Sequence, residues 1–285
     1  MMISKKIKGA IQLIRPELPL AAGVCVVLGE ILALGRLPPL RELLLGFTCG
    51  FFLSGSALTL NDYFDIEVDR VNAPQRPIPA GLLTGRDALL LTALVALLGL
   101  SAAFLLDPLA FTVGVIFWVI GVLYNWRYKA YGLWGNLMVA ASVGVTFILG
   151  GIAVGQPLNK IVWFFGLIAF LIDLAEEIAG DAMDIQGDRK RDSKSIAIVL
   201  GREAALRITA SLFIVVVLLS YAPFVFGWLG VLYVLMVCAL SPVVVLFTIR
   251  LLGSRTPEEG RAAMRGIYLS ILLGMLVFIA AQLLR

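Results

Sequence analysis

The sequence contains no histidine, and this absence excludes imidazole-based acid–base catalysis and zinc sites with histidine ligands. Cysteine is scarce, and Cys25, Cys49 and Cys238 all lie in apolar runs. We expect them to be small core residues rather than disulfide partners or metal ligands. Charged residues make up only 15% of the chain, so ionisable chemistry falls to a few Asp, Glu, Lys, Arg, Tyr or Cys side chains.

The 285 residues include no low-complexity linker and no extramembrane stretch long enough for a second domain. We therefore interpret residues 1–285 as a single transmembrane domain. Hydrophobic residues make up 60% of the chain and the mean hydropathy is +0.98, values typical of a polytopic helical membrane protein. No small-residue cleavage site follows the first apolar run, which predicts an uncleaved first span.

Nine apolar runs are long enough, or nearly so, to cross a hydrocarbon core of about 30 Å. Backbone polar groups in lipid must be satisfied internally, so these runs are predicted to be helices. The expected fold is an all-α integral membrane protein, a bundle of about nine transmembrane helices around a central cavity open to the cytoplasmic side. The runs lie near 18–35, 41–60, 88–106, 108–124, 137–154, 161–179, 204–222, 226–248 and 266–284.

Lysine and arginine are distributed unevenly over the connections between these runs. If the N-terminus is cytoplasmic, only Arg36, Arg41, Lys160 and Arg285 fall on the opposite side, and the other 19 of the 23 basic residues are cytoplasmic. This bias predicts a multi-pass protein of the cell membrane with a cytoplasmic N-terminus. It also places the mouth of the expected active site at cytoplasmic helix ends.

Two acidic motifs repeat one spacing in this apolar chain. The first motif is residues 61–69 and the second is residues 181–188. On a helix turning about 100° per residue, a three-then-four spacing keeps three carboxylates within a sector of roughly 60°. Hard oxygen ligands of this kind suit Mg²⁺, which is commonly bound by carboxylates, waters and substrate phosphates. The predicted metal ligands are Asn61, Asp62, Asp65, Asp69, Asp181, Asp184 and Asp188.

A solvated acidic face would explain one such motif, but stacked like charges repel unless a positive group sits between them. Other polar residues are predicted to lie on the same side of the membrane as both motifs. The segment 71–81 contains three prolines and is expected to form a structured loop that aims Arg76, although an ordinary connector has a similar composition. Tyr124, Lys129 and Asn136 follow at helix ends, and Lys190 and Arg191 follow the second motif as membrane anchors or as ligands of a substrate phosphate.

Two carboxylate motifs at the mouth of an apolar bundle suit an amphiphile with a diphosphate head and a long apolar tail. A prenyl diphosphate is such a molecule. Metal ions and cationic side chains would stabilise the diphosphate as the allylic C–O bond breaks. The apolar walls would shelter the resulting carbocation from water until an acceptor attacks C1.

The two motifs resemble the paired signatures of the UbiA superfamily of intramembrane prenyltransferases. The resemblance covers nearly the whole chain and includes the segments 76–81, 123–129 and 135–136. It implies a lateral, lipid-facing entrance and Mg²⁺-dependent transfer of a polyprenyl group. The resemblance assigns the Mg²⁺ and diphosphate to Asn61, Asp65, Asp69, Asp181, Asp184 and Asp188. The expected catalytic residues are Asp65, Asp69, Asp181, Asp188, Lys129 and Tyr124, and the expected substrate-binding residues are Asn61, Arg76, Lys129, Tyr124, Asn136, Lys190 and Arg191.

Within the superfamily, residues 177–191 and 195–201, together with Gly29 and Glu30, are most similar to the archaeal digeranylgeranylglyceryl phosphate synthases. That family joins geranylgeranyl diphosphate to geranylgeranylglyceryl phosphate and so forms the second ether bond of archaeal membrane lipids. The resemblance therefore implies a prenyl diphosphate donor and a lipid acceptor within the membrane. No nucleic-acid partner and no obligatory protein partner are expected.

Three other functions are compatible with parts of this pattern. The first is the same superfamily with an aromatic acceptor, as in quinone or chlorophyll synthesis. The second is a cation-coupled transporter, whose acids would lie near the bilayer midplane in broken helices rather than at one face. The third is a CDP-alcohol phosphotransferase, whose Asp-Gly and Ala-Arg signature this sequence does not contain.

Overall fold

The computed structural model describes residues 2–189 and 193–283, and the regular secondary structure of these residues is helical. In these residues, eight helical segments are long and apolar enough to cross a membrane. The predicted all-helical membrane fold is thus confirmed. The first half of the chain forms α1 (Met2–Ile14), α2 (Glu17–Leu34), α3 (Leu40–Phe64), α4 (Ile66–Asn72), α5 (Gly85–Leu106) and α6 (Pro108–Trp126).

The remaining elements begin with a short 3₁₀ helix, η1. They are η1 (Tyr128–Ala130), α7 (Leu133–Ala153), α8 (Lys160–Met183), α9 (Ile185–Arg189), α10 (Ile196–Val199), α11 (Arg202–Leu219), α12 (Ala222–Val225), α13 (Val231–Leu252) and α14 (Pro257–Leu283). The helix α8 has the length of a span but is not one of the eight apolar segments. It carries Asp173, Glu176 and Glu177, which lower its hydropathy.

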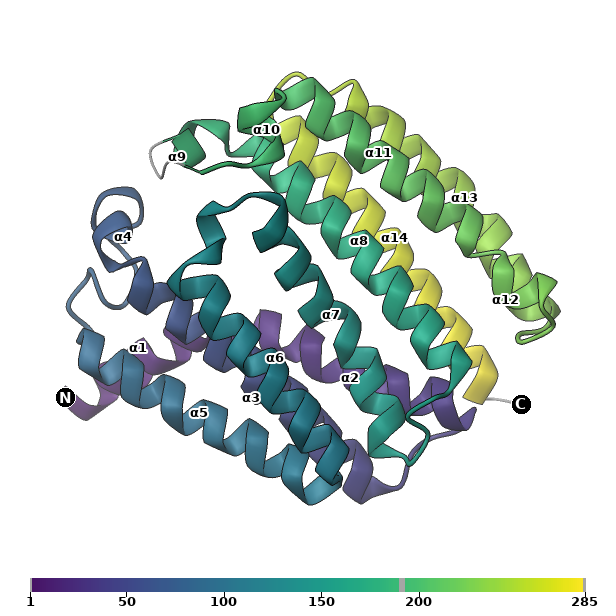
Figure 1. Ribbon diagram of the computed structural model, residues 1–285, viewed down its shortest axis with the longest axis horizontal. Helices are drawn as coiled ribbons and strands as arrows, with labels where there is room; N and C mark the ends of the chain where they lie inside the picture. Colours follow the sequence, from purple (N-terminus) through teal and green to yellow (C-terminus); the bar gives the residue numbers. More distant parts are fainter. Residues whose placement is uncertain (1, 190–192, 284–285) are drawn as a thin grey trace. The chain divides into compact units, whose positions relative to one another are not determined.

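The helices form two compact units. The first unit comprises Met1–Arg127 and Val145–Val162, and the second comprises Tyr128–Gly144 and Trp163–Arg285. The helix α7 is divided between the two units: its residues up to Gly144 belong to the second unit, and its residues from Val145 belong to the first. Figure 1 follows the chain through its helices in sequence colours.

In the first unit, α3 packs along both α2 and α5. Its core includes Val26, Cys49 and Leu149. Glycine allows the helix backbones to approach closely here, because a Cβ on Gly150 would collide with the carbonyl oxygen of Val26. Small residues at helix contacts are the usual means of close packing in lipid, where no hydrophobic force drives one helix against another.

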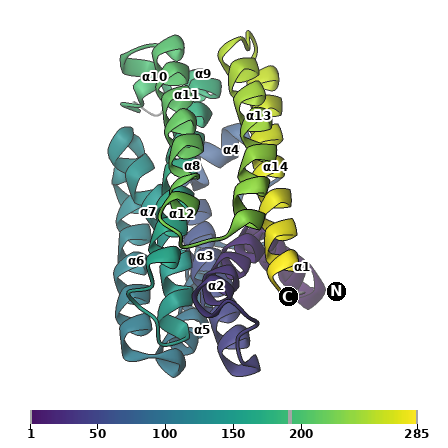
Figure 2. The ribbon, with the colours of Figure 1, turned by 90° about the vertical axis from the view of Figure 1, so that its right-hand side faces the viewer.

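The core of the second unit includes Ile178 of α8, Phe213 of α11 and Ile267 of α14. The helices α13 and α14 lie side by side and form a hairpin, as both ribbon views show (Figures 1 and 2). The cysteine prediction is correct for the buried Cys49 and wrong for Cys238 of α13, which is exposed. On a helix that faces lipid, a small apolar thiol gains nothing from turning inward.

Several predicted spans differ from the helices at their ends. The eighth apolar run was expected to begin at residue 226, but Gly227 adopts a left-handed φ of 64° and α13 begins only at Val231. The ninth was expected to begin at residue 266, but α14 already begins at Pro257. Its first turns carry charged side chains, which a helix tolerates where it projects beyond the apolar layer.

Candidate active site

The first motif lies where α3 meets α4. Asp62 is in the last turn of α3, Asp65 is the residue between the two helices, and Asp69 is in α4. The backbone pattern hardly breaks there, because Asp65 N donates to Asn61 O at 3.0 Å and Asp69 N donates to Asp65 O at 2.7 Å. All three aspartates are buried. The backbone of the first motif therefore keeps the predicted helical spacing, although not within one uninterrupted helix.

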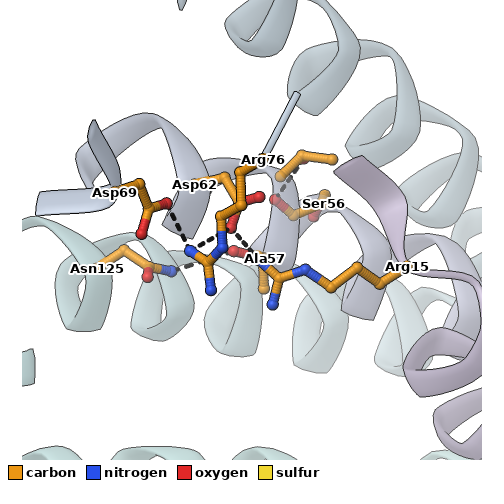
Figure 3. A network of polar contacts seen from close by, with 8 residues as sticks. Arg15, Ser56, Ala57, Asp62, Asp69, Arg76 and Asn125 are labelled. Atoms are coloured by element: carbon orange, nitrogen blue, oxygen red, sulfur yellow. Dashed lines mark hydrogen bonds and ion pairs between the residues drawn. The ribbon is translucent and has the colours of Figure 1, made fainter. Parts of the chain in front are cut away.

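Two arginines form ion pairs with aspartates of the first motif (Figure 3). Arg76 Nη1 donates to Asp69 Oδ2 at 2.5 Å and to Asp62 Oδ1 at 3.4 Å. Arg15, between α1 and α2, forms an ion pair with the same Asp62 oxygen. Burial alone lowers the pKa of Arg76, but its hydrogen bond to Asp69 and the charges of Asp62, Asp69 and Asp65 outweigh that effect and raise the pKa. Arg76 is therefore firmly cationic.

The proline-containing loop holds Arg76 in place. After α4, the chain folds into successive turns in which Ala80 N donates to Arg76 O at 2.9 Å and Leu82 N donates to Pro77 O at 2.9 Å. Leu83 then packs with Leu13 of α1 in a small apolar cluster. The loop is thus anchored against α1, and it directs the Arg76 side chain toward the first motif.

The helix α6 brings a further polar side chain, Asn125, against α3. Asn125 is buried, and its Nδ2 donates to Gly121 O at 3.0 Å and to Ala57 O at 3.3 Å (Figure 3). Its Oδ1 is buried and has no hydrogen-bond partner among the described residues. Tyr124, the predicted substrate-binding residue, precedes Asn125 in the chain and is half-buried.

The second motif also spans a helix end. Asp181 is in the last turn of α8, Asp184 follows the end of that helix, and Asp188 is in α9. Asn136 Nδ2 of α7 donates to Asp181 Oδ2 at 2.9 Å. Asp184 is exposed and accepts a hydrogen bond of 2.6 Å from Arg261 of α14. The helical turn continues to Asp184, whose N donates to Gly180 O at 3.0 Å, and α9 begins at the next residue.

Lys129 lies in η1, close enough to the Glu177 carboxyl for their charges to interact. The turn after η1 packs against the segment that follows the second motif. Lys194 N donates to Ala130 O at 2.9 Å, and a Cβ on Gly132 would collide with the carbonyl of Lys194. The predicted residues Lys190 and Arg191 and the side chain of Asp188 lie outside the described residues.

The first motif fits a hard divalent cation by its chemistry, since it offers only carboxylate and amide oxygens. Asp62 Oδ2 is buried without a hydrogen-bond partner among the residues described, so it is an acceptor that a cation would satisfy. In the part of the chain that the structure covers, no three His, Cys, Asp or Glu side chains are gathered closely enough to form a metal site. Arg15 and Arg76 instead balance the charge of the first motif.

The structure thus brings the predicted residues together in two groups. In the first unit, Arg76 contacts Asp62 and Asp69, and in the second unit Asn136 contacts Asp181. Sequence reasoning counted Arg15 only among the cytoplasmic basic residues and gave Asn125 and Arg261 no role at the site. A signal for Arg15 was its place directly before Pro16 at a helix boundary, and a signal for Asn125 was its position as an amide in an otherwise apolar run.

Several known proteins are similar to this chain along most of its length. The family model described as "UbiA prenyltransferase family" matches residues 22–278. The chain is 32% identical to a digeranylgeranylglyceryl phosphate synthase of Thermococcus kodakarensis over 98% of this chain and 99% of that one. It is 34% identical to the protein of that name from Methanopyrus kandleri, over 96% and 98% of the two chains.

Solved structures show the same fold. A structure from work on digeranylgeranylglyceryl phosphate synthase in membranes superposes with a TM-score of 0.83 at 26% identity, over 98% of this chain and 99% of that one. The apo structure of a UbiA homolog from Aeropyrum pernix superposes with a TM-score of 0.75 at 20% identity, over 91% and 98% of the two chains. The chain therefore belongs to the UbiA prenyltransferase family, and it is a multi-pass membrane prenyltransferase.

Proposed function

We propose that this prenyltransferase transfers the geranylgeranyl group of geranylgeranyl diphosphate to geranylgeranylglyceryl phosphate. The product would carry the second ether bond of an archaeal membrane lipid. The observation that carries the proposal is the likeness to digeranylgeranylglyceryl phosphate synthases, which extends over nearly the full length of both chains. The paired aspartate motifs supply the polar site that a diphosphate substrate needs.

Residues of both motifs are proposed to bind Mg²⁺ and diphosphate. The family model spans residues of both units, which supports one catalytic domain over residues 1–285. A UbiA homolog from Archaeoglobus fulgidus has been solved bound to GPP and Mg²⁺, which supports Mg²⁺ as the metal. Bound Mg²⁺ would neutralise charge on the diphosphate. The residues proposed to hold it are Asn61, Asp62, Asp65, Asp69, Asp181, Asp184 and Asp188.

The chain's own cations would bind the leaving group. Arg76 is held at the first motif by a loop, and its planar guanidinium has donors to spare for a phosphate oxygen. Lys129 would contribute a second positive charge, and Lys190 and Arg191 are proposed to contact phosphate as well. These groups would stabilise the charge that develops on the diphosphate as the allylic C1–O bond breaks.

The remaining residues would orient ligands and shelter the reacting carbon. Asn136 donates to Asp181 and so fixes the direction of that carboxylate. The half-buried ring of Tyr124 is proposed to face the allylic cation, because the faces of aromatic rings attract positive charge. The acceptor hydroxyl would attack C1 and form the ether bond as the C1–O bond to diphosphate breaks, and its proton would pass to the released diphosphate or to water.

The uneven distribution of lysine and arginine supports a cell-membrane location with the N-terminus and the mouth of the site in the cytoplasm. A variant whose only cysteine lies near the N-terminus tests this orientation. In sealed inside-out vesicles, a membrane-impermeant thiol reagent should label this cysteine without detergent. Labelling only after the vesicles are opened would contradict the proposed topology.

The function is tested with purified protein, geranylgeranyl diphosphate, Mg²⁺ and a panel of acceptors. We expect an ether product with geranylgeranylglyceryl phosphate, and no turnover with aromatic acceptors or in excess chelator. Added Mg²⁺ should restore turnover after chelation. Turnover with an aromatic acceptor alone would instead assign the chain to quinone or chlorophyll biosynthesis, and full activity in chelator would refute the metal-dependent mechanism.

A further inference from the structure

We propose that the α13–α14 hairpin binds the phosphate headgroup of an anionic membrane lipid. A cavity of about 480 Å³ lies at the connected end of the hairpin, and Phe247, Arg250, Ser254, Glu259 and Ala262 are among the residues that line it. None of its lining residues belongs to either aspartate motif. The two ribbon views show the helices side by side up to this end (Figures 1 and 2).

One wall of the cavity presents a cation. The ring of Phe247 of α13 packs closely against Gly266 of α14, where a Cβ would collide with it. The guanidinium carbon of Arg250 lies 5.4 Å from the centroid of that ring. This packing places the Arg250 side chain along the wall while leaving its N–H groups available. Arg250 is exposed and forms no ion pair with any residue that the structure describes.

The other polar groups of the cavity are already engaged. Arg202 donates to Ser254 O at 2.7 Å and to Ser254 Oγ at 2.9 Å. Glu259 Oε2 accepts a hydrogen bond of 2.7 Å from the N–H of Arg255, two residues before α14 begins. The Glu259 carboxylate thus serves the backbone of its own helix end rather than Arg250. Arg250 is therefore the group in this wall that an incoming anion would meet.

The surroundings of the cavity favour a lipid over a soluble anion. Ile249 of α13, next to Arg250, is 61% exposed, and Leu269 of α14, one turn beyond Gly266, is 64% exposed. In a membrane protein such side chains contact lipid tails. A lipid whose phosphate enters the cavity would keep its tails against this apolar surface. The site thus combines a charge for the headgroup with a hydrophobic path for the chains.

Native mass spectrometry of the purified full chain tests the proposal. Dioleoyl phosphatidylglycerol is titrated in neutral detergent and compared with dioleoyl phosphatidylcholine and with inorganic phosphate. We expect the wild type to bind phosphatidylglycerol preferentially. Arg250→Gln should weaken this binding at least about tenfold, because a hydrogen bond to a charged group contributes that much or more. Ala262→Leu should weaken it too, by filling the cavity without changing the charge.

Arg207→Gln is the matched control, because it removes an exposed arginine on α11 that is paired with Glu203 instead of lining the cavity. It should bind phosphatidylglycerol like the wild type. Prenyl transfer measured in phosphatidylcholine should be equal in all four proteins, which shows that each is folded. The proposal fails if Arg250→Gln and Ala262→Leu bind normally, if Arg207→Gln loses as much binding, or if inorganic phosphate competes on equal terms.

Discussion

Arg76 donates a hydrogen bond of 2.5 Å to Asp69, so the loop after α4 is joined to the first motif through a charged pair. The same guanidinium also reaches Asp62, which Arg15 contacts from the junction of α1 and α2. Three segments of the first unit therefore meet at one buried carboxylate. The first motif is held in shape by cations as well as by the helix backbone.

This pairing predicts a specific effect of Arg76→Gln. The variant should raise the KM for the prenyl diphosphate and lower kcat/KM by about tenfold to a hundredfold, since hydrogen bonds to charged groups contribute about 1.5–3 kcal/mol. Arg76→Lys should recover part of the loss, because it keeps the charge and loses the planar fork. Arg70→Gln is the control, because Arg70 is exposed and pairs with Glu67. Normal kinetics in Arg76→Gln would contradict the proposed role.

The pKa of Arg76 gives this prediction a pH signature. Its carboxylate partners raise that pKa, so the stabilisation from its charge is complete at lower pH and is lost only as pH rises through the raised value. That window lies far above neutral pH. The ratio of wild-type to Arg76→Gln kcat/KM should therefore be the same at about pH 7 and about pH 9. A ratio that falls steeply over this interval would show that another titrating group governs the effect.

Replacing a carboxylate of either motif by its amide should abolish most turnover. Asp65→Asn and Asp188→Asn each remove a negative charge with almost no change in size, and we expect kcat to fall by about 10²–10³-fold, as for the loss of one strong electrostatic contact. Circular dichroism and size-exclusion profiles should match the wild type. Glu67→Gln is the control within the first motif, because Glu67 is exposed and pairs with Arg70. Full activity in either aspartate variant would refute the assignment of that motif.

Asn136 is expected to act through Asp181. Asn136→Ala removes the 2.9 Å hydrogen bond that orients this carboxylate. The Mg²⁺ concentration for half-maximal turnover should rise about tenfold or more, as it does when groups that orient metal ligands are lost. Saturating Mg²⁺ should restore much of the rate, which a merely misfolded variant would not show. An unchanged Mg²⁺ dependence would make Asn136 a substrate contact or a structural residue instead.

The spans were predictable because long apolar runs leave the backbone in lipid no alternative to a helix. Helix ends were less predictable. Hydropathy detects the apolar part of α14 but not the charged first turns from Pro257, where Glu259 accepts the backbone N–H of Arg255 just before the helix. The predicted start of α13 was also wrong. The residues around Gly227 are apolar and therefore part of one hydropathy run, but the left-handed backbone of Gly227 interrupts the helix and α13 begins only at Val231.

The candidate site was predictable in its residue types and less so in its contacts. Spacing identified both acidic motifs, but it gave no sign of the partners of their side chains. Asp184, which follows the end of α8 at Met183, pairs with Arg261 of α14. Arg15 was counted only as a positive charge at the membrane surface. Its contact with Asp62 depends on the positive φ of 49° at Arg15 and on the turn between two helices, and a spacing pattern contains neither.

Close helix contact in the first unit predicts a stability effect remote from the aspartates. In Gly150→Ala the new methyl group would collide with the Val26 carbonyl and would lie 2.6 Å from Glu30 N, both of which belong to the backbone of α2. The backbone cannot move aside as a side chain can, so we expect a loss of about 1–3 kcal/mol or more in the free energy of unfolding, seen as a lower thermal midpoint in detergent.

Gly121→Ala is the control, because its Cβ would lie 3.8 Å from the Ala57 Cβ with no other close atom. That variant should be as stable as the wild type or up to about 1 kcal/mol more stable, since alanine favours a helix over glycine. Equal midpoints for the two variants would show that α7 does not approach α2 as closely as the structure has it.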